Sequence, residues 1–145
     1  MPRHVQALPP ISTRNWSGLV SSCLQTRTPM KRGEVYVAEL QPRSGSEQRG
    51  IRPVVVVSHD GFNDVPAWRS VIVVPCSTSA SQARRGPTAV PLAKGTAGLK
   101  HDGVALCHQI TTLDRSKLTK RIGALPEAVL AAVNAGLLAA LDLGK

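Results

Sequence analysis

Six short segments of the chain have the polarity pattern of β-strands, and polar breaks containing glycine or proline separate them. Residues 34–40 alternate between polar and apolar side chains, as a half-buried strand does. Residues 53–58 are an almost continuous β-branched run, which is too short for a usual helix and typical of a buried strand. The predicted strands cover residues 34–40, 53–58, 70–75, 88–92, 103–110 and 118–122.

The last part of the chain has a helical period instead. Pro126, which is tolerated early in a helix, precedes apolar residues at helical spacing. This apolar stripe consists of Val129, Leu130, Val133, Leu137, Leu138 and Leu141. Five or six strands followed by one amphipathic helix predict a mainly β fold, built as a strongly bent antiparallel sheet or small barrel.

Residues 1–29 differ in composition from the rest of the chain. Four prolines and many serines and threonines interrupt any helix or strand period there. We therefore expect a disordered N-terminal extension, or sequence upstream of a translation start at Met30, followed by one folded domain over residues 30–145. A transit peptide is the alternative, because the segment contains arginine and no acidic residue.

The net charge is +9, from 18 basic and 9 acidic residues among 145, which favours a polyanionic or acidic partner. Five basic and no acidic residues precede Glu34, so more than half of this charge lies in the first 32 residues. The charge of the folded part alone is therefore weak evidence for RNA binding. Aromatic residues make up 3% of the chain, too few for a row of rings that stacks bases.

Several classes of site find no support in the sequence. The cysteines Cys23, Cys76 and Cys107 lie far apart without the spacing of metal ligands, so we expect reduced thiols in a cytoplasmic protein and no bound metal. The phosphate-binding loop, the dinucleotide motif and the serine hydrolase motif are missing, so no cofactor is expected. No stretch is long and apolar enough to predict a membrane span.

The clearest candidate for chemistry is Arg52, in the loop from Gly45 to Pro53. Because Arg52 precedes a proline that begins a rigid strand, its backbone is biased to the extended region. An arginine on such a platform suits the stabilisation of charge on a phosphorane during in-line attack. The alternative is a surface arginine paired with a carboxylate.

Weaker candidates follow later in the chain. Ser77 and Thr78 come after a buried strand, where hydroxyls can bind phosphate or ribose oxygens or simply form a turn. His101 and His108 are candidates for acid–base chemistry, with a structural or solvated histidine as the alternative. Four basic residues could follow an RNA backbone or lie in solvated loops: Arg84, Arg85, Lys94 and Lys100.

Several specific sequence blocks follow one another in a fixed order. They are Lys31-Arg32-Gly33-Glu34-Val35-Tyr36, Gly45-Ser46-Glu47-Gln48, Arg52-Pro53, Pro75-Cys76-Ser77-Thr78, Asp102-Gly103-Val104-Ala105-Leu106, Gln109-Ile110 and Arg121-Ile122-Gly123. In this order the blocks resemble the MazF/PemK family of toxin endoribonucleases, and the resemblance covers about residues 31–143. The extension before Met30 has no counterpart in the family.

The resemblance implies a small SH3-like barrel with helices packed at its side, assembled as a homodimer. It implies cleavage of single-stranded RNA at a short sequence, without metal and with the ribose 2′-OH as nucleophile. The expected products carry a 2′,3′-cyclic phosphate and a 5′-OH. It also implies inhibition by a cognate MazE-like antitoxin, whose acidic and largely disordered tail occupies the RNA groove.

The resemblance also implies roles for individual residues. Arg52 matches the family's catalytic arginine, which stabilises the developing charge and is a candidate acid. Ser77 stands where the family usually has threonine, its second catalytic residue, and Glu47 matches a glutamate implicated in some members, a candidate base for the 2′-OH. The residues expected to bind RNA are Ser46, Gln48, Arg49, Thr78, Arg84, Arg85 and Gln109.

Departures from the family pattern leave the cleavage sequence and one alternative function open. Ser77 lacks the methyl group that restricts χ1 in threonine. His108 stands where an acidic residue is frequent and Thr111 where a basic one is, and both changes can alter base preference. The alternative is a non-catalytic toxin of the same fold that binds a protein such as DNA gyrase. A pure binder of this kind does not need the set of Glu47, Arg52 and Ser77.

Overall fold

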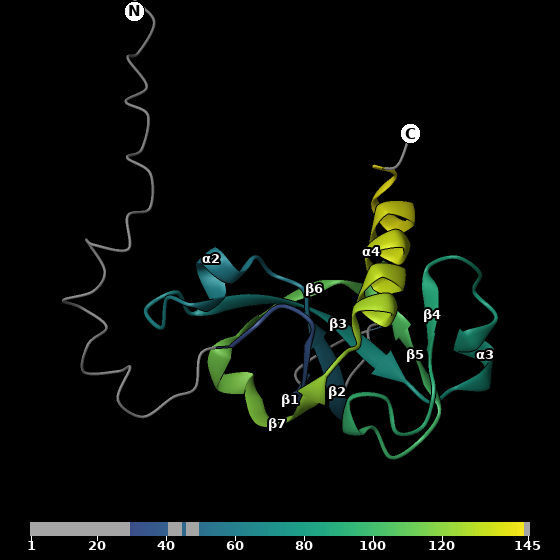
Figure 1. Cartoon of the computed structure of the whole chain (residues 1–145), viewed down its shortest axis with the longest axis horizontal. Coiled ribbons are helices and arrows are strands. Elements are labelled where there is room, and N and C mark those ends of the chain that lie inside the picture. Colours follow the sequence, from purple (N-terminus) through teal and green to yellow (C-terminus); the bar gives the residue numbers. More distant parts are fainter. Residues whose placement is uncertain (1–29, 41–44, 46–49, 144–145) are drawn as a thin grey trace, which may run out of the picture.

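The computed structural model describes residues 30–40, 45 and 50–143 (Figure 1). The extension predicted over residues 1–29 lies outside the described residues. The strands in the described part are β1 Glu34–Glu39, β2 Ile51–Val56, β3 Ser70–Ser77, β4 Ala89–Leu92, β5 Gly103–Leu106, β6 Thr111–Asp114 and β7 Leu118–Ala124. The helices are α2 Asp60–Asn63, α3 Ala80–Ala83 and α4 Glu127–Leu141, with short 3₁₀ turns η1 Thr96–Gly98, η2 Cys107–Gln109 and η3 Arg115–Lys117.

The strands form one antiparallel sheet in the order β4-β5-β3-β2-β1-β7, and β6 pairs with β3 beside this path. β3 joins the two halves, because its residues pair successively with β6, β2 and β5. The predicted mainly β fold with a C-terminal helix is confirmed. Within the described residues no pairing connects β4 to β7, so the sheet stays open and is barrel-like only in a loose sense.

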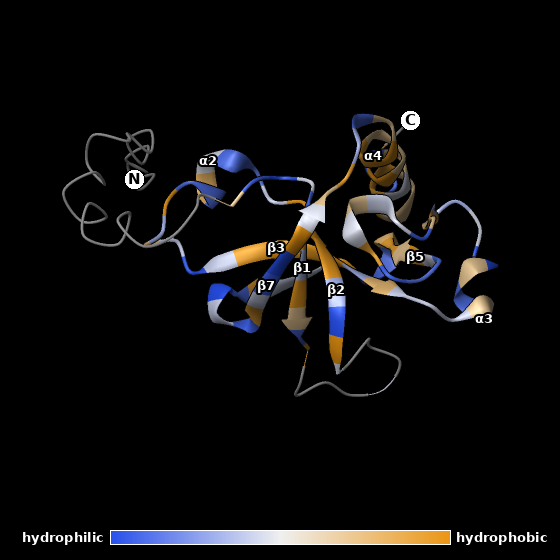
Figure 2. Cartoon of the chain, turned by 60° about the horizontal axis from the view of Figure 1, so that its bottom comes forward, coloured by the Kyte–Doolittle hydropathy of each residue, from blue (hydrophilic) through white to orange (hydrophobic). Residues whose placement is uncertain are grey.

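β3 is coloured largely as hydrophobic in Figure 2. The side chains of the β-branched runs belong to apolar clusters on both faces of the sheet. Successive side chains of a strand point to opposite faces, so Val55 and Val57 pack with Val133 of α4, while Val54 and Val56 pack in a second cluster. This double burial is the physical reason for runs of valine where a one-sided sheet would show alternation.

The structure corrects several of the predicted strand ends, and three of the corrections concern candidate site residues. β2 begins at Ile51, so Arg52 lies inside the strand and not before it. β3 continues through Pro75 to Ser77, because pairing changes there from β2 to β5. The strand predicted over residues 103–110 ends at Leu106, and His108 lies in the 3₁₀ turn η2.

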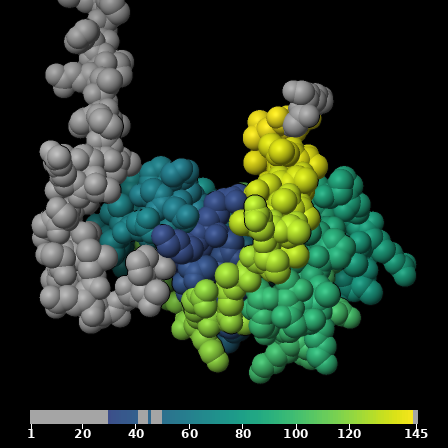
Figure 3. Space-filling view, viewed as in Figure 1, coloured from purple at the N-terminus to yellow at the C-terminus, as the bar shows by residue number. Residues whose placement is uncertain are grey.

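The predicted terminal helix is confirmed, but its apolar surface is wider than one stripe. Val133 is fully buried against the sheet, whereas Leu138 and Leu141 are 46% and 50% exposed. After Glu127 the helix carries no charged residue, and α4 stands out from the body of the molecule (Figure 3). Its exposed face consists of Ala128, Ala131, Ala132, Ala135, Leu138, Ala139 and Leu141. Among the described helices, none is long and apolar enough to cross a membrane.

Candidate active site

A pocket of about 840 Å³ lies where β1, β2, β3 and β7 approach the segment 98–103. Arg52 of β2 and Ser77 of β3 both line it, although 25 positions separate them in the sequence. Thr78 lines the pocket beside Ser77. The structure therefore brings together the two residues that the sequence analysis singled out on separate strands.

Strand pairing fixes the backbone of Arg52. Arg52 lies opposite Ala38 of β1, and the next residue, Pro53, lies opposite Val37. Ala38 is fully buried, so this part of β1 belongs to the core and provides a rigid base. The half-buried Arg52 can thus reach the pocket from a strand whose position the core determines.

Ser77 is held at the last position of β3. Its side chain is buried, and its Oγ accepts a hydrogen bond of 3.1 Å from the backbone N–H of Ser79. A serine hydroxyl that accepts in this way can still donate its own proton. Opposite, Gly103 of β5 lies so close that a Cβ there would fall 2.7 Å from the carbonyl oxygen of Ser77. Ser77 therefore has the hydroxyl of the expected threonine and a closely packed backbone.

The charges around the pocket are predominantly positive. Its described lining residues include five basic side chains and no Asp or Glu, the basic ones being Arg52, Lys100, His101, Lys120 and Arg121. Arg121 is ion-paired with Glu34, whose side chain is 7% exposed, and this hydrogen-bonded carboxylate raises the pKa of Arg121. A phosphodiester entering the pocket would meet cations on several sides.

The thiol in the pocket wall is unsuited to nucleophilic chemistry. Burial raises the pKa of Cys76 to about 12, and the nearby Cys107 thiol adds to the increase. Burial also raises the pKa of Cys107 to about 11. Both thiols therefore stay protonated near neutral pH, and nucleophilic cysteine chemistry requires the thiolate. The expected buried thiols are confirmed at these two positions.

The remaining predicted site residues are not found among the described lining of the pocket. Arg84 and Arg85 are exposed after α3, and Gln109 lies in η2; none of the three lines the pocket. Ser46, Glu47, Gln48 and Arg49 lie outside the described residues. Among the described residues, no cluster of three or more His, Cys, Asp or Glu side chains is placed to hold a metal ion.

His108, the other histidine considered for acid–base chemistry, is absent from the pocket lining. Within the described part, both of its ring nitrogens are buried without a hydrogen-bond partner. Burial lowers its pKa, and the charge of Arg85 lowers it further.

Sequence reasoning missed Lys120 as a pocket residue. Lys120 lies on β7 opposite Val37, and a register irregularity in this pairing lets Lys120, Arg121 and Ile122 all line the pocket. The sequence contains no local signal for such an irregularity, although the Arg121-Ile122-Gly123 block marked the segment.

Comparison with known proteins gives a consistent result. Residues 31–141 match the family described as PemK-like, MazF-like toxin of type II toxin–antitoxin system. A protein named endoribonuclease MazF from Staphylococcus saprophyticus is 37% identical over 105 residues, which make up 72% of this chain and 85% of that protein.

Two solved structures share the fold. The crystal structure of MazF from Deinococcus radiodurans is similar with a TM-score of 0.67 and 27% identity, covering 81% of this chain and 100% of the other. An endoribonuclease in complex with its cognate antitoxin from Mycobacterial species has a TM-score of 0.65 and 26% identity, over 80% and 98% of the two chains. By its sequence blocks and its fold, this chain belongs to the PemK-like, MazF-like toxins of type II toxin–antitoxin systems.

Proposed function

We propose that this protein is an endoribonuclease toxin that cuts single-stranded RNA, mRNA above all, by metal-independent attack of a ribose 2′-OH. The observation that carries the proposal is the meeting of Arg52 and Ser77 in one cation-rich pocket. These are the two residues that match the family's catalytic positions. The relative from Staphylococcus saprophyticus is named an endoribonuclease, which supports the activity.

In the proposed reaction, the 2′-oxygen attacks the adjacent phosphorus and the bond from phosphorus to the 5′-oxygen breaks. Negative charge accumulates on the non-bridging oxygens, where the guanidinium of Arg52 can donate paired hydrogen bonds. The hydroxyl of Ser77 can donate a further hydrogen bond to the same phosphate. The products carry a 2′,3′-cyclic phosphate and a 5′-OH.

Glu47 remains our candidate base for the 2′-OH, because it matches a glutamate implicated in some members of the family. We assign the predicted RNA contacts to Thr78, which lines the pocket, and to Arg84 and Arg85, which follow α3, a helix that begins three residues after Ser77. Lys100 and Lys120 join them, because both line the pocket. The remaining contacts proposed are Ser46, Gln48, Arg49 and Gln109.

We further propose a homodimer in the cytoplasm, inhibited by a MazE-like antitoxin. The related mycobacterial endoribonuclease is in complex with its cognate antitoxin, which supports a partner of this kind. An acidic antitoxin segment suits a pocket whose described lining includes five basic residues and no carboxylate.

The test is cleavage of a long RNA by purified protein in EDTA, with Arg52→Ala as the decisive variant. We expect the wild type to cut and to leave cyclic-phosphate ends. Arg52→Ala should lose at least about 10²–10³-fold in rate, because the developing charge loses its main donor. The variant should also lose growth inhibition while keeping its fold and its dimer.

Arg69→Ala is the matched control, since it removes an exposed arginine that is paired with Asp114 and does not line the pocket. It should cut like the wild type. Cleavage by folded Arg52→Ala at the wild-type rate would contradict the proposed mechanism. Intact RNA combined with retained toxicity of the wild type would instead favour the toxin that binds a protein target.

A further inference from the structure

Residues 98–101 line one side of the pocket and belong to the segment 94–102. Hydrogen bonds within the segment define its shape: Gly95 N–H donates to the carbonyl of Leu99 at 2.8 Å, and Lys94 N–H donates to Asp102 Oδ1 at 2.7 Å. Leu99 is buried in the main apolar cluster. The side chains that follow Leu99 thus project from an anchored turn.

Close backbone packing holds this segment against β7. Ala97 has a positive φ of 50°, an uncommon conformation for alanine. A Cβ at Gly123 would fall 2.5 Å from the carbonyl oxygen of Ala97, and a Cβ at Gly98 would fall 3.0 Å from that of Ile122. The backbones of the segment 94–102 and of β7 can approach this closely because a glycine stands at each of the two contact points.

This packing places His101 in the same pocket as Arg52 and Ser77. His101 is exposed, so its imidazole can reach a bound ligand without rearrangement of the core. The next residue, Asp102, uses Oδ1 to close the turn. The turn thus fixes the backbone on either side of the histidine while the imidazole itself stays accessible.

Cleavage of RNA needs a proton donor, because the leaving 5′-oxygen is a poor leaving group as an alkoxide. Guanidinium and ammonium groups retain their protons near neutral pH, so the arginines and lysines of the pocket stabilise charge better than they donate protons. Cys76, with its pKa raised to about 12, is also a poor acid. Histidine is the residue type that exchanges protons near neutrality, and His101 is the histidine among the described lining residues.

We propose that His101 is the general acid of the cleavage reaction, an inference that rests on the proposed function. As the 2′-oxygen bonds to phosphorus, the 2′-hydroxyl proton passes to the general base of the proposed reaction, which later releases it to water. As the bond between phosphorus and the 5′-oxygen breaks, the His101 imidazolium gives its proton to that oxygen. The neutral imidazole then takes a proton from water, and the enzyme returns to its starting state.

This role predicts the direction of the pH dependence. A general acid must be protonated to act, so the cleavage rate should fall as the pH rises. The other charged side chains that line the described pocket or close the adjacent turn are Arg52, Lys100, Lys120, Arg121 and Asp102. None of these is a residue type that exchanges protons in the neutral range, so the fall of the rate with pH should disappear when His101 is replaced.

The experiment first maps the cut sites of the wild type on a long RNA and then uses an oligonucleotide that spans one of them. Single-turnover rates between pH 5 and 9 are compared for the wild type, His101→Gln and His101→Ala. We expect both variants to lose about 10²–10⁴-fold in rate, the usual contribution of acid–base catalysis. Both should lose the descending limb, and added imidazole should partly restore His101→Ala.

A second substrate separates proton donation from a structural role. In an oligonucleotide with sulfur at the 5′-bridging position, the thiolate leaves without a proton, so an acid is not needed. His101→Ala should therefore cut this substrate at nearly the wild-type rate. His59→Asn is the matched control, because His59 caps α2 outside the pocket and asparagine also caps helices well. It should keep the wild-type pH profile.

The outcomes are distinct. If the wild type cuts and His101→Ala cuts equally fast with the same pH profile, this inference is wrong while the proposed function stands. An equal loss of rate on the sulfur substrate assigns His101 a positioning role and also overturns the inference. RNA left intact by the wild type overturns the proposed function together with the inference.

Discussion

A side chain at position 103 would occupy space that the backbone of Ser77 fills. The pairing of β3 with β5 aligns Ser77 with Val104, and Gly103 lies next to this pair. The backbone of Ser77, which carries the hydroxyl, can occupy its position because Gly103 has no Cβ atom. At this scale, a residue without functional groups contributes to the site by permitting close approach of two strands.

Gly103→Ala should lower the cleavage rate, although the variant retains both Arg52 and Ser77. The added Cβ would lie 2.7 Å from the Ser77 carbonyl oxygen, so the end of β3 must shift. We expect a loss of about 1–3 kcal/mol in the free energy of unfolding, as for overpacked positions. Urea denaturation measures the stability, and single-turnover cleavage should fall by more than the unfolded fraction explains.

Gly61→Ala is the control for this substitution, because a Cβ at Gly61 approaches only the side chain of His59, which can rotate. Its cleavage rate should stay close to that of the wild type, and its stability should fall by no more than about 0.5–2 kcal/mol, because rotation of His59 breaks its capping hydrogen bond from the Gly61 N–H. Wild-type cleavage by Gly103→Ala would show that the exact position of Ser77 does not limit the reaction.

The sequence predicted part of this residue-level arrangement. Pro53 indicated a fixed backbone at Arg52, and the end of a valine run indicated an end position for Ser77. The convergence of the two side chains on one pocket depends on the order of β1, β2 and β3 in the sheet, which local pattern does not contain. The contribution of Lys120 depends on an irregular pairing of β7, which has no local signature either.

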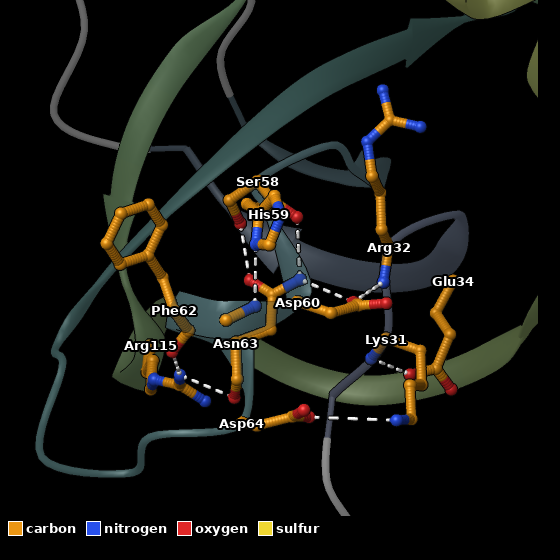
Figure 4. Close-up of polar contacts among 11 residues, drawn as sticks. Lys31, Arg32, Glu34, Ser58, His59, Asp60, Phe62, Asn63, Asp64 and Arg115 are labelled. Atoms are coloured by element: carbon orange, nitrogen blue, oxygen red, sulfur yellow. Dashed lines mark hydrogen bonds and ion pairs between the residues drawn. The ribbon is translucent and has the colours of Figure 1, made fainter. Parts of the chain in front are cut away.

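At the scale of elements, the segment from His59 to Arg69 is held mainly by hydrogen bonds of polar side chains. Sequence analysis predicted a loop there, whereas the structure contains α2 and the turns that follow it. Asn63 is 1% exposed and exchanges hydrogen bonds with Ser58, and Arg115 donates to several carbonyl groups of this segment (Figure 4). Such long-range polar contacts leave no period in the sequence, which is why the helix was missed.

Arg115→Lys should destabilise this segment, although it conserves the charge. The guanidinium of Arg115 donates to the carbonyl oxygens of Phe62 at 2.9 Å, Asn63 at 2.7 Å and Val65 at 3.1 Å, and its Nε donates to that of Trp68 at 2.5 Å. A single ammonium group cannot reproduce this fork. We expect a loss of about 1–3 kcal/mol in unfolding free energy, measured in urea, since carbonyl groups lose their donors.

Hydrogen exchange gives the location of this effect, because amides between Phe62 and Trp68 should exchange faster in the variant than in the wild type. Arg69→Lys is the matched control. Its ion pair with Asp114, at 3.0 Å, joins two side chains that are 54% and 43% exposed. Exposed pairs contribute less than about 1 kcal/mol. Equal stability of the two variants would mean that the Arg115 contacts do not hold the segment.

At the scale of the whole molecule, α4 is apolar on both sides. Its inner face packs in the main apolar cluster, and its outer face is apolar and exposed. A helix that is apolar all round is usually buried on all sides. Leu138 and Leu141 are 46% and 50% exposed, and alanines fill the rest of the face. Small residues allow two helices to approach closely, and a two-fold axis would bring this face against its own copy. This geometry supports α4 as part of the proposed dimer interface.

Ala135→Glu should therefore shift the protein from dimer to monomer. Ala135 lies in the middle of the exposed face, and a carboxylate there would be buried without a partner in a dimer built on α4. We expect the dimer dissociation constant to rise by at least about tenfold, which corresponds to about 1.4 kcal/mol. Sedimentation velocity over a range of concentrations measures this dissociation constant.

Ser81→Glu is the control. It places the same charge on the exposed surface of α3 and should leave the dimer intact, because that helix has no comparable apolar face. A dimer that survives Ala135→Glu with unchanged affinity would assign the interface to another surface, for example the one that exposes Trp68 and Ile72.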